Sequence, residues 1–402
     1  MNGFVEFGKR LKFVKIHDLL EVFPMIVGFL MSIFVRIKYK NLWLICERPN
    51  EARDNGYWFF KYMCEYHPEI DAVYAIDSTS VDYPKVSKLG KTIPYGSLKH
   101  WAYYFAAKRN ISSQKEGKPN AALCFILEVY LGLVKNRAYI RHGICKDNQE
   151  WINYRITKIN LIFTSAKPEH DLMIDTLNYP EKNVALTGLC RYDNLLSDHE
   201  VKRQILVMPT MREWLRVISS DTLKYEKSKK FTDSEYFLTW SSLLHSEKLK
   251  NVLEKYNIKL LFFPHSTMQK YLGDFNCNSQ NILIADARQY DVQQLLMESA
   301  ALITDYSSIY FDFAYMKKPL IYYQFDYDKY RKGQYQEGYF VYKRDGFGPV
   351  VEKEDLLVSE IENIIENNMQ MPLEYKNKVD DFFAFHDTCN CKRTFDAINN
   401  MK

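Results

Sequence analysis

Short apolar runs recur along the chain after Lys40, and longer amphipathic stretches separate them. Uninterrupted runs of four to six residues between helical stretches predict parallel strands in βα units, because helices cover such strands on both faces. The runs lie at residues 41–46, 71–76, 137–141, 160–164 and 183–187, and then at residues 204–208, 258–263, 281–284, 300–304 and 319–323. The pattern therefore predicts an α/β fold with two doubly wound, Rossmann-like domains.

The two series of runs are separated by the polar stretch LLSDHEVKRQ at residues 195–204, which is the predicted domain boundary. A chain of 402 residues has about twice the usual length of a single domain. The predicted organisation is an N-terminal segment, a first domain, a second domain and a C-terminal segment, at residues 1–40, 41–200, 201–381 and 382–402.

The N-terminal segment combines an apolar run at residues 23–35 with basic clusters on both sides. Thirteen residues are too few to cross a hydrocarbon core, which needs about 20. We expect a helix that lies in the membrane interface, where its cations meet anionic lipid. The alternative is a hydrophobic helix docked on the body of the protein. Residues 41–402 carry equal numbers of basic and acidic side chains, which argues against a nucleic-acid partner.

The eight cysteines are scattered along the chain, with no C-x-x-C pair and no cleavable signal peptide. We therefore expect reduced thiols that serve mainly in packing. Cys389 and Cys391 form a C-x-C near the end, but no second pair at zinc spacing accompanies them. No metal site is predicted there.

Polar residues of the first predicted domain follow its strands directly. Open parallel sheets bind ligands beyond the carboxyl ends of their strands, so these positions are candidates for substrate contacts. The first domain offers Arg48, Arg53, Asn55, His142, Gly143 and Arg191 at such positions.

The second predicted domain has a similar set of residues after its strands, namely Arg212, His265, Thr304, Asp305, Ser307 and Ser308. Cationic side chains that face a common cleft from both domains would suit anionic partners.

His142 and His265 each follow a predicted strand, one in each domain. Imidazole titrates near neutrality, so one histidine could accept a proton from an attacking hydroxyl while the other, when cationic, stabilises phosphoryl oxygens. The alternative is that both are structural or simply exposed.

The segment Asp305-Tyr306-Ser307-Ser308 precedes a helix expected to begin near Ile309. Ser and Asp are favoured N-caps, and the free N–H groups of a helix start suit a phosphate. The plainer interpretation is that these residues only cap the helix. Arg212 could clamp the same phosphate with its fork of donors, or could pair with an acid such as Glu213.

Asp326-Tyr327-Asp328 spells D-x-D, which in some transferases holds a divalent ion. Two carboxylates alone indicate a metal poorly, because Mg²⁺ usually takes further ligands from substrate phosphates. A solvated loop is the prediction here. The chain lacks a Walker loop, G-x-G-x-x-G, H-E-x-x-H and G-x-S-x-G, so no tightly bound cofactor is expected and no divalent cation is indicated.

Residues 302–330 resemble the signature of the CDP-glycerol:poly(glycerophosphate) glycerophosphotransferases, the teichoic acid primases and polymerases and their capsule relatives. The chain is similar to that family over about residues 41–398. Five further blocks resemble the family in the same order, at residues 47–62, 141–147, 187–195, 208–215 and 262–266.

This resemblance implies a GT-B architecture, with an acceptor domain and a nucleotide-binding domain facing a cleft and a final helix that crosses back. It implies transfer of glycerol phosphate, or a related polyol phosphate, from CDP-glycerol to a hydroxyl of a lipid-linked acceptor, with release of CMP. The implied partners are a CDP-polyol donor, that acceptor and a membrane surface. The implied location is the cytoplasmic face of the bacterial cell membrane, where the protein would be peripheral.

The matching motifs also imply roles for individual residues. His142 would be the base, and His265 a second essential histidine near the transferred phosphate. The donor phosphates would lie near Thr304, Asp305, Ser307 and Ser308, with help from Arg212. Lys146 and Asp312 lie in the same blocks and are further substrate-binding candidates.

The chain departs from the family in its first histidine block, where H-G-T-P-L-K is replaced by HGICKD at residues 142–147. The histidine stays in place, but the identity of the acceptor is open. Two alternatives remain: a GT-B glycosyltransferase that uses a nucleotide sugar, and a non-catalytic, membrane-associated assembly partner. The sequence also leaves open the polyol, the number of units added and the polymer.

Overall fold

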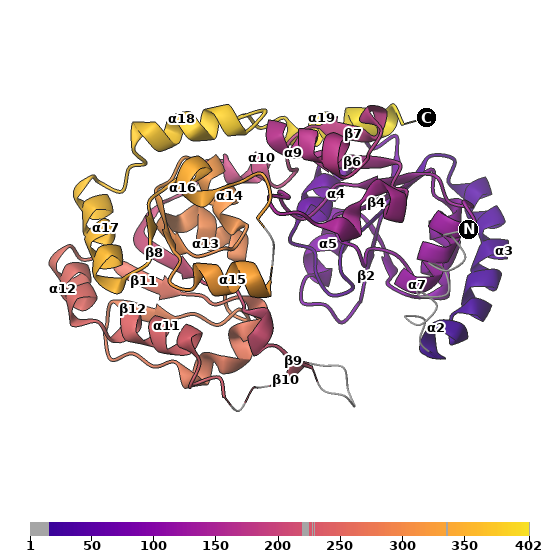
Figure 1. Ribbon diagram of the computed structural model, residues 1–402. Helices are drawn as coiled ribbons and strands as arrows, with labels where there is room; N and C mark the ends of the chain where they lie inside the picture. Colours follow the sequence, from indigo (N-terminus) through magenta and orange to yellow (C-terminus); the bar gives the residue numbers. More distant parts are fainter. Residues whose placement is uncertain (1–15, 219–224, 227, 229, 335–336, 402) are drawn as a thin grey trace. The chain divides into compact units, whose positions relative to one another are not determined.

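The computed structural model describes residues 16–218, 225–226, 228, 230–334 and 337–401. The chain forms two compact units, each with one large parallel sheet (Figure 1). Unit 1 comprises Met1–Ile144, Gln149–Asn194 and Asp387–Lys402, and unit 2 comprises Cys145–Asn148 and Leu195–His386.

The sheet of unit 1 has seven parallel strands in the order β3-β2-β1-β4-β5-β6-β7. The order reverses between β1 and β4, which makes that position the topological switch point of the sheet. The strands are β1 (Leu42–Cys46), β2 (Asp71–Ile76), β3 (Lys91–Pro94), β4 (Arg109–Ser112), β5 (Arg137–Tyr139), β6 (Leu161–Thr164) and β7 (Val184–Leu186).

Strand β1 is buried along its whole length, and its alternating side chains enter two separate cores. Trp43 packs between Phe59 of helix α4 (Asn55–Tyr66) and Phe395 of helix α19 (Asn390–Asn399). On the other face, Leu44 belongs to the core that includes Trp101 of helix α6 (Leu98–Ala106). The last helix of the chain is therefore part of the core of unit 1.

Further short helices complete unit 1. They are α5 (Tyr83–Leu89), α7 (Ala121–Phe125), η1 (Ile126–Tyr130), η2 (Glu150–Ile152), α8 (Tyr154–Thr157), α9 (Lys167–Asp171), η3 (Leu172–Thr176), η4 (Glu181–Asn183) and α10 (Tyr192–Leu195), whose last residue is assigned to unit 2.

Helices α2 (Ile16–Leu20) and α3 (Val22–Lys38) form the apolar N-terminal segment, and one side of α3 is docked on α6. A Cβ atom added to Gly28 would lie 2.4 Å from the Cβ of Trp101, so the two helices are in close contact. The Trp101 indole also donates to a Glu21 carboxylate oxygen at 3.0 Å. The alternative of a helix docked on the body is thus correct for this side of α3.

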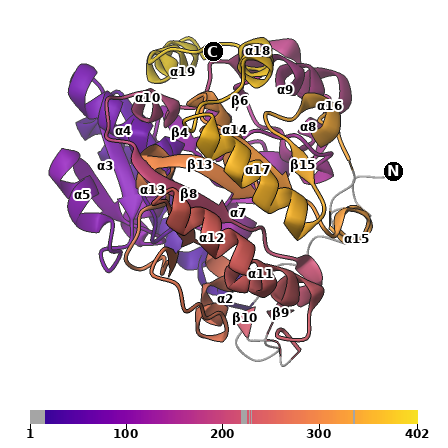
Figure 2. The same cartoon turned by 90° about the vertical axis from the view of Figure 1, so that its left-hand side faces the viewer.

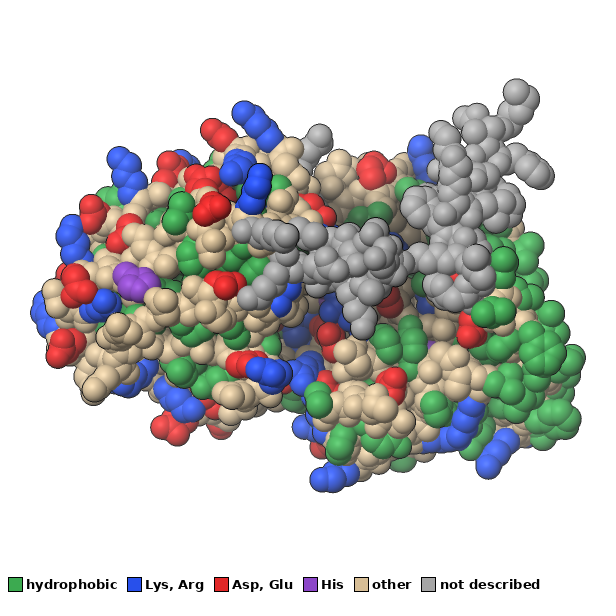
Figure 3. All heavy atoms as spheres, turned by 90° about the horizontal axis from the view of Figure 1, so that it is seen from below, with side chains coloured by type: hydrophobic (Ala, Val, Ile, Leu, Met, Phe, Trp, Pro, Cys, Tyr) green, Lys and Arg blue, Asp and Glu red, His purple; other side chains and the backbone are tan. Residues whose placement is uncertain are grey.

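The rest of this helical segment exposes large apolar side chains, which form the green patch over α3 in Figure 3. We call it the α3 apolar face, and it comprises Leu19, Leu20, Phe23, Ile26, Phe29, Leu30, Met31, Ile33, Phe34 and Ile37. Helix Asp18–Lys38 has 21 residues and a mean hydropathy of 2.0, enough to cross a membrane by length and composition alone. The prediction from the run at residues 23–35 was therefore wrong about length. The basic residues Lys9, Arg10, Lys12 and Lys15 lie outside the described residues.

The sheet of unit 2 has six parallel strands in the order β12-β11-β8-β13-β14-β15. Relative to their order in the chain this is the 3-2-1-4-5-6 pattern of dinucleotide-binding folds, and its switch point lies between β8 and β13. The strands are β8 (Lys202–Met208), β11 (Lys259–Phe262), β12 (Ile282–Ile284), β13 (Ser299–Thr304), β14 (Leu320–Tyr323) and β15 (Val350–Val351). A separate antiparallel pair consists of β9 (Val217–Ile218) and β10 (Tyr225–Glu226).

Helices α11 (Glu235–His245), α12 (Glu247–Lys255) and α17 (Glu354–Glu366) share one core with the strands of this sheet and lie side by side in Figure 2. Other helical segments of unit 2 are η5 (Glu213–Leu215), η6 (Ser266–Asp274), α13 (Val292–Glu298), α14 (Ile309–Tyr315), α15 (Tyr327–Gly333), α16 (Tyr342–Asp345) and α18 (Leu373–Phe382).

The ten strands predicted from the apolar runs are all present, so the α/β class with two doubly wound parallel sheets is confirmed. Strands β3, β4 and β15 of the two parallel sheets, and the antiparallel pair β9 and β10, were not predicted. The chain passes into unit 2 at Leu195 and returns to unit 1 at Asp387, and Cys145–Asn148 also belong to unit 2.

Candidate functional site

The loop after β1 and the loop after β5 are joined at the switch point of unit 1 by Asn55 and Arg191. The Asn55 side chain is fully buried at the start of α4, donates to the Arg141 carbonyl at 2.8 Å and accepts the Arg191 backbone N–H at 3.0 Å. The Arg191 guanidinium pairs with Asp54 at 2.9 Å and donates to the His142 carbonyl at 2.8 Å. Both residues were predicted to bind substrate. That role stays a prediction, and in the structure both side chains hold the His142 loop through these bonds.

His142 is exposed at the tip of a sharp turn. The preceding Arg141 has φ of 57°, in the left-handed region that non-glycine residues rarely adopt, and its guanidinium donates to the Gly143 carbonyl at 3.2 Å. Although the His142 residue has an exposed surface, the dense protein around its ring lowers the imidazole pKa, and the charges of Arg141, Arg191 and Arg48 lower it further. The neutral imidazole, which can accept a proton, is thus the favoured form.

Glu47 was not among the predicted site residues, yet it organises the loop after β1. Its buried carboxylate accepts the backbone N–H groups of Arg53 at 3.0 Å and Tyr57 at 2.8 Å. Burial, and then the charge of Asp54, raise the Glu47 pKa to about 8. A Cβ at Gly56 would lie 2.8 Å from the Glu47 side chain, so this carboxylate fits only against glycine. In the sequence, the signal that could have identified Glu47 was an acidic residue directly after an apolar run.

Arg48 and Arg53 lie at the surface of unit 1 and have acidic partners. Arg48 pairs with Glu51 at 3.2 Å, and Arg53 pairs with Asp82 at 2.7 Å. Half of the Arg48 side chain is exposed. Because exposed pairs of this kind are weak, Arg48 keeps a charge that an anionic ligand can reach.

Lys146 is buried in unit 2, and its ammonium forms an ion pair with Asp147 at 2.6 Å. Arg331 binds the second oxygen of the same carboxylate at 2.7 Å. Burial favours the neutral acid, but the two cations outweigh it and lower the Asp147 pKa. A Cβ at Gly338 would lie 2.2 Å from the Lys146 carbonyl oxygen, which shows how closely the segment at residues 145–148 packs there.

Arg212 is fully buried at the switch point of unit 2. It forms two bonds to the Asp326 carboxylate, at 2.7 and 3.0 Å, and an ion pair with Asp305 at 2.8 Å. Nη1, the nitrogen that pairs with Asp305, also donates to the Thr210 carbonyl at 2.7 Å. Burial opposes the charge, but the two carboxylates raise the Arg212 pKa. The expected alternative of an ion pair with an acid thus applies, with Asp305 and Asp326 as partners in place of Glu213. Phosphate binding by Arg212 stays a prediction.

Thr304 and Asp305 are likewise buried, and their side chains form hydrogen bonds within the protein. The Thr304 hydroxyl donates to the Met208 carbonyl at 2.7 Å, and an Asp305 oxygen accepts the backbone N–H groups of Thr210 at 2.8 Å and Tyr306 at 2.6 Å. These residues join the ends of β8 and β13. These contacts give both residues a framework role in this structure, and direct contact with donor phosphates stays a prediction.

Ser307, Ser308 and His265 are the predicted residues of unit 2 that solvent reaches. The two serines precede α14, on which the predicted Asp312 is buried. His265 follows β11, and its Nδ1 bonds the Thr267 hydroxyl at 2.9 Å. Its backbone N–H donates to the Pro209 carbonyl at 3.3 Å, which places it beside the loop after β8. Among the predicted residues at this sheet edge, the accessible groups are thus one imidazole and two hydroxyls.

The D-x-D segment does not form an open pair of carboxylates. Asp326 binds Arg212 and accepts the Tyr306 hydroxyl at 3.0 Å, whereas Asp328 is exposed. Within the described ranges, no three His, Cys, Asp or Glu side chains are grouped closely enough to hold a metal ion. All eight cysteines are free thiols, and five of them are buried.

Comparison with known proteins places this geometry in context. A family model described as CDP-Glycerol:Poly(glycerophosphate) glycerophosphotransferase matches residues 27–400. The minor teichoic acid biosynthesis protein GgaB of Bacillus subtilis (strain 168) is 35% identical over 372 residues, which is 91% of this chain and 40% of GgaB.

Two Staphylococcus aureus (strain NCTC 8325 / PS 47) proteins are also similar. A teichoic acid glycerol-phosphate transferase is 37% identical over 98 residues, or 24% of this chain and 25% of that protein. The teichoic acid ribitol-phosphate polymerase TarL is 27% identical over 207 residues, or 50% of this chain and 35% of TarL. The chain thus spans less than half the length of these curated relatives.

Among solved structures, the wall teichoic acid polymerase TagF aligns with a TM-score of 0.66 and 18% identity, over 99% of this chain and 97% of the TagF chain. A putative UDP-N-acetylglucosamine 2-epimerase from Listeria monocytogenes aligns with a TM-score of 0.56 and 12% identity, over 89% and 95%. At these identities the likeness concerns the fold, and it agrees with the GT-B type predicted for the two sheets.

Proposed function

Because this chain belongs to the CDP-glycerol:poly(glycerophosphate) glycerophosphotransferase family, we propose that it transfers glycerol phosphate, or a related polyol phosphate, from a CDP-polyol to an acceptor hydroxyl. The acceptor is a lipid-linked or polymeric teichoic acid or a related surface glycan. The family match over residues 27–400, with a histidine after β5 and another after β11, carries this proposal. A TagF structure obtained from a soak with CDPG supports the choice of donor.

In the proposed reaction, an acceptor oxygen attacks the phosphorus that bears the polyol. The new P–O bond forms as the bond to the CMP phosphate oxygen breaks, and CMP leaves. His142 accepts the proton of the attacking hydroxyl, a role that its lowered pKa supports because the imidazole is neutral before the reaction. Asn55 and Arg191 hold the loop that presents it.

On the donor side, His265, Ser307 and Ser308 are the groups proposed to contact the phosphates, since they are accessible at the ends of β11 and β13. Phosphoryl transfer needs mainly alignment and charge stabilisation, which hydrogen-bond donors can supply. Arg48 and Gly143 remain proposed neighbours of the substrates. Lys146 and Asp312 act through the packing described above.

The chemical test is an assay of nucleotide release. The purified protein, incubated with lipid-linked acceptor and CDP-glycerol, is expected to release CMP. His142→Ala and His265→Ala should each lower the rate by ~10²- to 10⁴-fold, the range for loss of an acid–base group. His245→Ala is a matched control, because His245 is exposed on α11 and is bonded to Asn276.

Two results would overturn the assignment. Release of UDP from UDP-sugars, with no release of CMP from CDP-polyols, would identify a glycosyltransferase. Full activity of both histidine variants in a complementation test would favour the non-catalytic assembly partner.

We further propose that the α3 apolar face binds the cytoplasmic surface of the cell membrane. Eight of its ten exposed apolar side chains lie on α3, whose last turn carries Arg36 and Lys38, and basic flanks favour anionic lipid. The proposal is tested by co-sedimentation with vesicles of anionic phospholipid.

The double variant Phe23→Asp/Phe34→Asp should lose vesicle binding by at least ~10-fold, because two exposed rings that would enter the membrane interface are replaced by charges. Leu373→Asp, on a similarly exposed residue of unit 2, should bind as the wild type does. Equal binding of all three proteins would contradict the proposal. Resistance of the bound wild type to alkaline carbonate would indicate a spanning helix in place of a peripheral one.

A further inference from the structure

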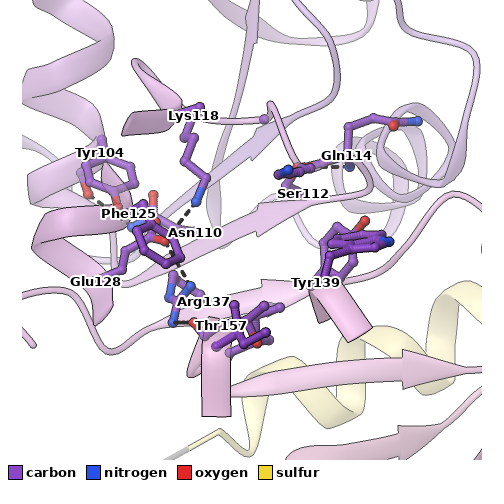
Figure 4. Close-up of a pocket in the computed structure, with 17 residues that line it drawn as sticks. Tyr104, Asn110, Ser112, Gln114, Lys118, Phe125, Glu128, Arg137, Tyr139 and Thr157 are labelled. Atoms are coloured by element: carbon purple, nitrogen blue, oxygen red, sulfur yellow. Dashed lines mark hydrogen bonds and ion pairs between the residues drawn. The ribbon is translucent and has the colours of Figure 1, made fainter. Parts of the chain in front are cut away.

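Unit 1 contains a pocket that none of the predicted site residues lines. It has a volume of about 230 Å³ and lies against β4 and β5, between α7 and η1 on one side and η2 and α8 on the other (Figure 4). The pocket is therefore built entirely from residues of unit 1.

The walls of the pocket are mostly apolar and aromatic. Phe125 and Tyr139 face it in Figure 4, and Ile156 and Ile159 complete the apolar lining. Trp151 lines it as well and is 39% exposed, so it stands where the pocket meets solvent. The Lys115 ammonium lies 5.6 Å from the centre of the Trp151 ring.

A buried carboxylate at the base of the pocket is already fully paired. Glu128 accepts bonds from Lys118 at 2.7 Å, Arg137 at 2.8 Å and the Tyr104 hydroxyl at 2.6 Å, as the dashed lines in Figure 4 show. Burial favours the neutral acid, but the two cations outweigh it and lower the Glu128 pKa. These contacts fix the shape of the bottom of the pocket. Because the Glu128 carboxylate is fully paired, the cluster gives no evidence for a ligand.

Two polar atoms of the lining stand apart from that cluster. Asn110 Oδ1 and Arg137 Nε are buried, and neither has a hydrogen-bond partner within the part of the chain that the structure describes. Both residues are only 9% exposed, and they are register partners on the adjacent strands β4 and β5. Burial of such groups without a partner is costly.

The chemical identity of the two atoms is fixed by their surroundings. The Asn110 amide nitrogen donates to the Tyr104 carbonyl and to Asn136 Oδ1, both at 3.0 Å, so Oδ1 is an acceptor. Arg137 Nε carries a hydrogen and is a donor. An acceptor and a donor on neighbouring strands suit a hydroxyl group, which both donates and accepts.

We propose that this pocket binds a neutral sugar ring. Its hydroxyls would bond Asn110 Oδ1 and Arg137 Nε, and its apolar face would lie on the aromatic wall that includes Trp151. A prenyl chain offers no hydroxyl to these two atoms. A phosphate fits less well, because its oxygens accept hydrogen bonds and would leave Asn110 Oδ1 without a donor, and because Lys118 and Arg137 already pair with Glu128.

The pocket is connected to the loop that carries His142. Gln114 lines the pocket and donates to Asp54 at 3.0 Å, Asp54 pairs with Arg191, and Arg191 bonds the His142 carbonyl. The next step rests on the proposed function. We assign the sugar ring to the acceptor, which would bind to unit 1, the unit that carries the proposed catalytic base His142.

The test measures binding of free monosaccharides to the full chain by saturation-transfer difference NMR. The probes are glucose and N-acetylglucosamine, with glycerol 3-phosphate and geranyl phosphate as competitors. We expect a sugar signal that neither competitor displaces. Trp151→Ala should weaken sugar binding by about tenfold, and Trp151→Phe should restore most of it because a ring remains.

Arg137→Lys provides a second, independent variant. It keeps a cation for Glu128 but removes the Nε donor, so sugar affinity should fall roughly five- to tenfold. Tyr66→Ala is the control, because Tyr66 is an exposed aromatic residue of α4 that does not line the pocket. Melting temperatures within about two degrees of the wild type show that each variant is folded.

The proposal is overturned if the wild type gives no sugar signal, if Trp151→Ala binds sugar as the wild type does, or if either competitor displaces the sugar. Its failure is distinct from failure of the proposed function. Unchanged acceptor KM in Trp151→Ala, with normal CMP release, would refute only the pocket. Sugar binding without CMP release from any CDP-polyol would refute only the transferase.

Discussion

At the scale of single residues, the side chains predicted to touch substrate divide into those that solvent reaches and those that hold the framework. His142, His265 and Ser308 are accessible, whereas Asn55 and Arg212 are fully buried. The sequence shows which residue types follow each strand. It does not show that Arg212 meets Asp326, because the partners are 114 positions apart in the chain.

The charge of Arg48 contributes to the electrostatic environment of His142. Arg48 is one of three cations that lower the His142 pKa, and it is the most exposed of them. In Arg48→Gln the imidazole pKa should rise toward its usual value near 6.5, because a protonated ring then meets less repulsion. The acidic limb of the profile of kcat/KM against pH should therefore move to higher pH.

The measurement is kcat/KM between pH 3 and 7 for wild type and Arg48→Gln, because the His142 pKa is lowered to about 3. Arg288→Gln serves as the control, since Arg288 is an exposed residue of unit 2 paired with Asp286. An acidic limb that stays in place, or moves to lower pH, would contradict the role of Arg48.

At the scale of elements, apolar runs were sufficient to predict ten strands but not β4. That strand begins with Arg109 and Asn110, which look like surface residues in the sequence. Arg109 is buried because its guanidinium donates to the carbonyl of Ile398, at the end of α19. A polar strand of this kind becomes recognisable only when its distant partner is known.

Arg212 joins the loops that follow three strands of unit 2, and its removal should destabilise that unit. Arg212→Met would leave Asp305 and Asp326 buried without their cation, which typically costs ~3–5 kcal/mol. Thermal unfolding should show a clear fall in the melting temperature. Lys329→Met is the control: its exposed pair with Glu235 should contribute less than ~1 kcal/mol. Equal melting temperatures for the two variants would refute the framework role.

Docking of α3 on α6 depends on the close approach at Gly28. In Gly28→Ala the new methyl would meet the Trp101 Cβ at 2.4 Å, and overpacking of this kind costs ~1–3 kcal/mol. Hydrogen exchange of the α3 amides should therefore accelerate. Gly273→Ala is the control, since nothing lies within 4 Å of its added Cβ. Unchanged exchange in Gly28→Ala would show that α3 does not need this contact.

At the scale of the whole molecule, local sequence indicated two sheets and a change of unit near residue 195, but not the assignment of Cys145–Asn148 to unit 2. That assignment depends on tertiary partners: Asp147 pairs with Arg331. The return to unit 1 likewise depends on Asp193, which accepts the backbone N–H groups of Asn390 and Cys391, each at 2.8 Å. The sequence alone does not show that Asp147 meets Arg331 or that Asp193 meets Asn390. The predicted segments 1–40 and 382–402 therefore have less precise bounds than the units in the structure.

Transfer of a polyol phosphate to a lipid-linked acceptor can be observed by mass spectrometry of that acceptor. After incubation with the protein and CDP-glycerol, the acceptor should gain the mass of one or more glycerol phosphate units, and His142→Ala should leave it unchanged. An acceptor that stays unmodified with every CDP-polyol, but gains a hexose from a UDP-sugar, would contradict the account.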